Sequence, residues 1–164
     1  MNEEIKKQML LNSESYQFFL NETRKAEKKF FRYSALCGLE MEKVSNDVEQ
    51  QISNGGEGLD LRPININIFS EAIIQGKKFI TASNKFITEL NMMKELSVNI
   101  MDDDLGFGNE KSNFLEEYIS SIDKTIQIQY TVLELISNEI EMLQSIVDNE
   151  IPENDSDDDG VNYE

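Results

Sequence analysis

The acidic residues near the end of the sequence have the spacing of a calcium-binding loop. Residues 155–160 read Asp-Ser-Asp-Asp-Asp-Gly, and carboxylates at the first, third and fifth positions before a Gly match the opening of such a loop. The bidentate Glu of a calcium loop comes at its twelfth position, which the sequence does not contain. We therefore expect solvated acidic chain here and no metal site.

The other groups able to do chemistry have no partners at useful spacings. Asp102, Asp103 and Asp104 stand together without a spaced companion, and three carboxylates at a helix C-terminus oppose the helix dipole. Cys37 is the single cysteine, and the chain has no His. This composition excludes Cys-rich zinc sites, internal disulfides and His-dependent catalysis. We predict a non-enzymatic protein with no catalytic residue, bound metal or cofactor.

A band of cations interrupts the acidic sequence and is a candidate docking site. The band consists of Arg24, Lys25, Lys28, Lys29 and Arg32. It could receive an acidic partner, or it could be neutralised by residues 112–150 of the same chain, which hold eight acids and one Lys. The sequence favours the second interpretation, because that complement is always present.

The overall charge limits the partners of the chain. Its 164 residues have a formal charge of −17, with 39% hydrophobic residues. Such a charge repels phosphate backbones and anionic lipids. The first apolar group is too short for a signal peptide, and no run approaches a membrane span. We expect a soluble, intracellular protein of the cytoplasm or nucleus that binds no nucleic acid directly and does not insert into membranes.

Three segments with helical periodicity must position all of these residues. They run over about 2–53, 67–101 and 113–149, and breaks rich in Gly, Asn and Asp separate them. The fold class predicted is all-α: an elongated antiparallel three-helix bundle over 1–151 with coiled-coil-like heptad packing. Residues 152–164 form a disordered acidic tail. Gly38, inside the first segment, is where a bend would fall.

The apolar residues of the first two segments recur at steps of three and four. In the first segment this row passes through Phe30 and Cys37 to Met41 and Ile52. In the second segment it is unbroken and alternates large with small side chains. Its members are Phe69, Ala72, Gly76, Phe79, Ser83, Phe86, Leu90, Met93, Ser97 and Ile100. Such a row predicts the buried face of a helix that neighbours can approach closely.

The third segment carries two apolar rows, so its apolar face is wider than one neighbouring helix requires. The first row runs from Leu115 to Val147, and Asn113 has the position of its N-cap. The second row is the candidate interaction surface. It comprises Tyr118, Ile128, Val132, Leu135, Met142 and Ile146.

These features together predict a protein that acts through contacts between helices. The expected function is a helical protein–protein interaction module, a subunit or adaptor of a larger helical or coiled-coil assembly. Its partner would be another helical chain, in a hetero- or homo-oligomer. One alternative is an acidic mimic of nucleic acid or an inhibitor. Another is a small helical secretion partner or chaperone, although the chain has no Trp for the Trp-x-Gly turn of such proteins.

Overall fold

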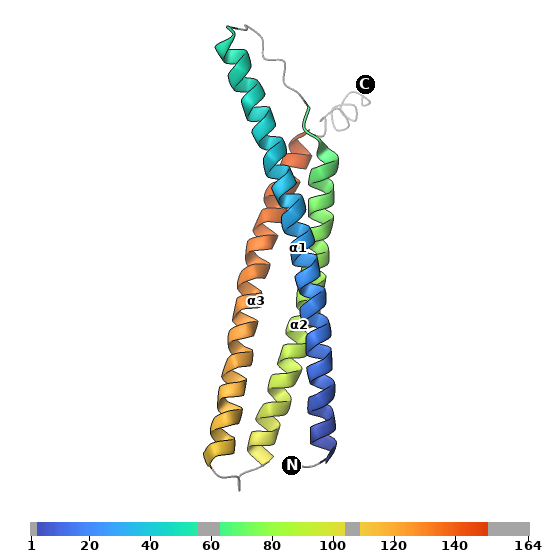
Figure 1. Cartoon of the computed structure of the whole chain (residues 1–164), viewed down its shortest axis with the longest axis vertical. Helices are drawn as coiled ribbons and strands as arrows, with labels where there is room; N and C mark the ends of the chain where they lie inside the picture. The colour runs from blue at the N-terminus through green and yellow to red at the C-terminus, as the bar shows by residue number, and fades with distance from the viewer. Residues whose placement is uncertain (1–2, 56–62, 104–108, 151–164) are drawn as a thin grey trace, which may run out of the picture.

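The chain forms three long helices packed side by side. A computed structural model describes residues 3–55, 63–103 and 109–150, and the side chains of 12–55, 63–102 and 114–150. The helices are α1 (Glu3–Ser53), α2 (Ile66–Asp103) and α3 (Asn109–Glu150). α1 and α3 run in one direction and α2 in the other (Figure 1). The prediction of an all-α, elongated, antiparallel three-helix bundle is confirmed.

The helix boundaries differ slightly from those predicted. α3 begins at Asn109, one turn before the predicted cap at Asn113, because residues 109–112 contain neither Gly nor Pro and can continue the helix. α1 continues through Gly38 without a break. Residues 152–164 and the calcium-like segment lie outside the described residues, as does Asp104.

α2 supplies the centre of the bundle. All ten residues of its predicted apolar row are buried. α1 and α3 each pack against α2, whereas in the described part of the chain no Cα of α1 comes within 8 Å of a Cα of α3. We call the side of the bundle on which α1 and α3 face each other, without such close backbone approach, the seam.

The core consists of two apolar clusters. The first, in which all three helices meet, comprises Phe30, Cys37, Phe69, Ala72, Ile73, Phe79, Ile136, Ile140, Leu143 and Val147. The second comprises Phe86, Leu90, Met93, Ile122 and Ile126, with Tyr16, Phe19, Leu20 and Tyr118 packed against it.

Polar side chains lie between the two clusters. The hydroxyl of Ser83, which is fully buried on α2, donates a 3.0 Å hydrogen bond to Gln129 Oε1 on α3. Thr23 on α1, 2% exposed, lies midway between Tyr16 and Phe30, and its Oγ1 has no hydrogen-bond partner among the described residues. The hydrogen bond between Ser83 and Gln129 favours one register of α2 and α3, because any other register leaves the two groups unpaired.

Gly76 is the point at which all three helices come together. A Cβ at this position would lie 2.6 Å from Ile140 Cδ1 on α3 and 3.1 Å from Phe30 Cδ1 on α1. Both neighbours pack onto the surface that the missing side chain leaves. The small residue is therefore required by packing and not by a turn.

The apolar row of α1 follows the prediction as far as Cys37 and then departs from it. Met41 is 39% exposed and Ile52 62% exposed, while Glu40 is buried. A row spaced by 3.5 residues drifts around a straight helix of 3.6 residues per turn. In addition, the last turns of α1 extend past the ends of α2 and α3 (Figure 1), so they have no helix to pack against.

Two Gly-to-Ala substitutions on different helices test the role of Gly76. Gly76→Ala should lower the free energy of unfolding by about 1 kcal/mol, because overpacking of roughly 1–3 kcal/mol exceeds a helix-propensity gain of about 1 kcal/mol. Gly38→Ala, with no atom within 4 Å of its Cβ position, should raise it by roughly 0.5–1 kcal/mol. Urea denaturation measures both. An equal gain at the two sites would show that α2 does not need a small residue.

Candidate interaction surfaces

The six residues of the predicted surface on α3 divide into two rows. Ile128, Leu135 and Met142 are 60%, 64% and 52% exposed and are spaced by seven residues. The other three, Tyr118, Val132 and Ile146, are half-buried and pack against the two core clusters. The structure therefore leaves three exposed apolar side chains on one side of α3, one every seven residues.

This exposed row borders the seam between α1 and α3. The Ser34 hydroxyl of α1 donates a 3.0 Å hydrogen bond to Glu139 Oε1 of α3, and this bond places the two residues at one level. Leu135 and Met142 lie four residues before and three after Glu139, so they share its side of α3.

α1 contributes apolar residues to the same seam. Phe31, 51% exposed, lies three residues before Ser34, and Met41 lies seven after it. Because α1 and α3 are parallel, Phe31 stands at the level of Leu135. Gly38, with nothing within 4 Å of its Cβ position, leaves open space at the level of Met142. We call these residues the seam surface: Phe31, Met41, Ile128, Leu135 and Met142.

Cys37 lies below the seam surface and is chemically protected. Its side chain is 3% exposed. Burial, and secondarily the carboxylate of Glu139, raises the pKa of the thiol to about 11. The thiolate is the reactive form of cysteine, so this position favours packing over nucleophilic chemistry.

The basic band of α1 is not neutralised by α3, contrary to the preferred interpretation of the sequence. In the described part of the chain, its one ion pair joins Lys25 Nζ to Glu22 Oε1 of the same helix, at 3.6 Å. Arg32 additionally lies 5.7 Å from the Tyr33 ring centroid. Among the described residues, no acid of α3 forms an ion pair with the band. The cations of the band remain available to a partner.

The described residues meet neither the requirements of a metal-binding cluster nor those of a membrane span. No cluster of three Cys, Asp or Glu residues that could hold a metal is present there. None of the described helices has the length and apolar content of a bilayer span. No family model, characterised protein or solved structure matches the chain.

The labelling rate of Cys37 measures its protection directly, because it is the single cysteine of the chain. At pH about 8, a pKa of about 11 leaves roughly one thousandth of the thiol ionised. Alkylation of the native protein should be at least about 100-fold slower than alkylation of the protein in denaturant. Comparable rates in the two conditions would mean that Cys37 is accessible.

Proposed function

We propose that this protein is a non-enzymatic helical interaction module that binds a helix of another chain along the seam surface, as a subunit or adaptor of a larger helical assembly. The observation that carries the proposal is the row Ile128, Leu135 and Met142, exposed at heptad spacing where the backbones of α1 and α3 stand apart. Exposed apolar residues gathered in this way are typical of association sites.

A fourth helix would pack on the side of the bundle where α1 and α3 face each other without close backbone contact. Residues spaced by seven present one face to a helical partner, as the a positions of a coiled coil do. Burial of each large apolar side chain contributes about 1.5–3 kcal/mol. Phe31 and Leu135, at one level on opposite sides of the seam, would then contact the same turn of the partner.

The polar groups in the seam would limit which helices fit. Glu139 already accepts the hydrogen bond from Ser34, so a partner must place a small or polar residue beside that pair. The acidic residues of α3 would repel acidic helices approaching this side. Discrimination by repulsion is a common source of specificity.

Substitution of Leu135 tests the proposal. Leu135→Glu should leave the helical circular dichroism and the melting temperature almost unchanged, because the side chain is 64% exposed and such changes cost less than about 0.5 kcal/mol. It should abolish association with the partner chain, measured by light scattering on the purified protein and by quantifying the proteins that co-purify from its native cells.

Two further variants make the result interpretable. Gln127→Glu adds the same charge at an exposed position of α3 outside the seam surface, and it should preserve association. Ile136→Ala, at a residue 1% exposed, should lower the free energy of unfolding by roughly 2–5 kcal/mol. If the wild type is a monomer, and Leu135→Glu and Gln127→Glu co-purify with the same proteins, the seam surface is not an interface.

A further inference from the structure

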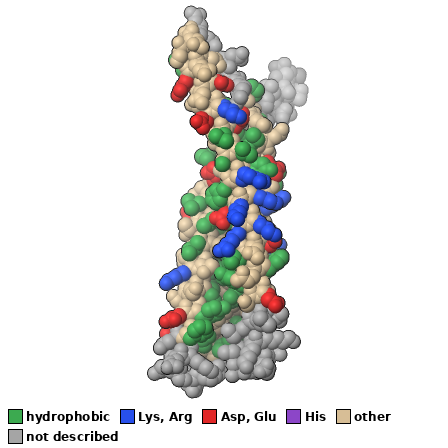
Figure 2. All heavy atoms as spheres, in the orientation of Figure 1, with side chains coloured by type: hydrophobic (Ala, Val, Ile, Leu, Met, Phe, Trp, Pro, Cys, Tyr) green, Lys and Arg blue, Asp and Glu red, His purple; other side chains and the backbone are tan. Residues whose placement is uncertain are grey.

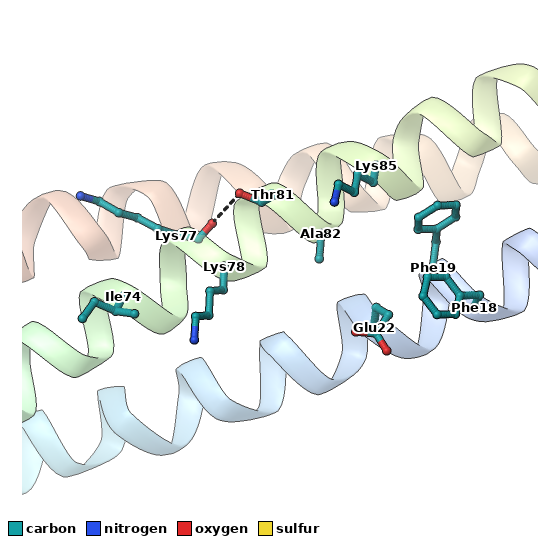
Figure 3. A pocket seen from close by; sticks show the side chains of 9 residues that line it. All are labelled: Phe18, Phe19, Glu22, Ile74, Lys77, Lys78, Thr81, Ala82 and Lys85. Carbon is teal, nitrogen blue, oxygen red and sulfur yellow. Dashed lines mark hydrogen bonds between the residues drawn. The ribbon is translucent and has the colours of Figure 1, made fainter.

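A second surface, on the other side of α1, is a groove between α1 and α2. It has a volume of about 520 Å³, and its lining residues are Phe18, Phe19, Glu22, Ile74, Lys77, Lys78, Thr81, Ala82 and Lys85. From α1, Phe19 points toward α2, while Lys78 and Ala82 of α2 point toward α1 (Figure 3). The groove is separate from the seam surface, because Glu22 of the groove and Phe31 of the seam surface are nine residues apart and thus lie on opposite sides of α1.

The base of the groove is apolar and open to solvent. Phe18 keeps 59% exposure and Ile74 keeps 45%, whereas Phe19 and Ala82 are half-buried. Phe18 and Ile74 lie at opposite ends of the groove (Figure 3). The Phe18 and Phe19 rings contact each other edge to face, with centroids 5.3 Å apart. An occupant would therefore gain hydrophobic burial at both ends of the groove.

The α2 side of the groove carries lysines without ion pairs to any described residue, whereas on the α1 side Glu22 pairs with Lys25 at 3.6 Å. Within the described residues, Lys77, Lys78 and Lys85 form no ion pair. On α1, the row through Phe18 and Glu22 continues at steps of three and four to Lys25, Lys29 and Arg32. Lys and Arg side chains gather midway along the bundle in Figure 2. A chain of charge −17 thus keeps a concentrated positive patch over an apolar groove.

The cations on the two sides of the groove have matching periods. Lys78 and Lys85 on α2 are seven residues apart, as are Lys25 and Arg32 on α1, which is about 10.5 Å along a helix. The rings of Tyr16 and Phe86 contact each other at an angle of 56°, with centroids 5.4 Å apart, and Phe30 lies against the Gly76 position. These two contacts place Lys25 at the level of Lys78. Because α1 and α2 are antiparallel, the cations extend from this shared level in opposite directions: those of α1 toward Ile74, and Lys85 of α2 toward Phe18.

We propose that this groove binds an acidic amphipathic helix of another protein, with apolar residues at heptad spacing and Glu or Asp on both flanks. Such a helix would place its apolar row against Phe18, Ile74 and Ala82, and its flanking carboxylates beside Lys25, Lys78 and Lys85. Flanking charges of this kind set the choice of partner in helical assemblies. This binding site goes beyond the proposed function, because it uses a different surface and a partner of defined charge.

A synthetic helix of three heptads tests the proposal, with Leu at positions a and d and Glu at e and g. The chain contains no Trp, so Phe18→Trp in the full chain provides a single fluorophore inside the groove. Titration of the peptide should change the Trp emission saturably at about 50 mM salt. Raising the salt to about 500 mM should weaken the binding by at least tenfold, because salt screens exposed charges.

Matched variants locate the binding site. In the Phe18→Trp background, Lys78→Glu with Lys85→Glu should weaken binding by at least about tenfold. Lys43→Glu with Lys124→Glu, two exposed lysines outside the groove, should leave it within about twofold, and so should Leu135→Glu in the seam surface. A peptide with Lys in place of Glu at e and g should not bind.

Three results would overturn the proposal for the groove and would not count against the proposed function of the seam surface. One is equal binding by the two double-lysine variants. Another is binding that Leu135→Glu abolishes, which would move the peptide to the seam surface and support the proposed function instead. The third is salt-sensitive self-association of the chain that Lys78→Glu with Lys85→Glu removes, because a second copy would then be the occupant.

Discussion

The close packing of Phe30 and Ile140 on Gly76 is the contact on which the arrangement of the helices depends. Interiors pack densely, so the missing side chain decides how near α1 and α3 can come to α2. It lets both of them reach the same turn of α2 without meeting each other's backbone. Both proposed surfaces follow from this geometry. The seam surface lies where α1 and α3 stand apart, and the groove lies on the opposite side of the contact between α1 and α2.

Much of the fold could be predicted because α2 touches both neighbours. Its row from Phe69 to Ile100 is buried at every position, since a helix that packs on two sides has little freedom in which residues it buries. α1 was predictable only as far as Cys37. Beyond Cys37 the periodic pattern continues through Met41, which is exposed. The last turns of α1 extend past the ends of α2 and α3, and periodicity alone does not show where a neighbouring helix ends.

The candidate surfaces were predictable only in part. The second apolar row of α3 was visible as a pattern, yet which of its members are exposed depends on the position of α1. Val132 packs against the core, whereas Leu135, three residues later, does not. The groove was missed altogether. Its cations on α1 and α2 are more than forty residues apart in the chain, and the register set by Tyr16 and Phe86 brings Lys25 and Lys78 to one level. The sequence offered two signals: the basic band of α1, which includes Lys25, and the seven-residue spacing of Lys78 and Lys85.

The separation of the α1 and α3 backbones also has a consequence for how the chain reaches its native state. Every pair of helices whose Cα atoms approach within 8 Å is consecutive in sequence, so the topology amounts to two hairpins sharing α2. Neither hairpin needs distant parts of the chain to meet before it can form, and such local topologies carry a small entropic cost of loop closure and fold rapidly. The hydrogen bond from Ser34 to Glu139 spans 105 residues and can form once both hairpins have closed. The side of the molecule that we propose binds a partner is thus complete only when all three helices have packed together.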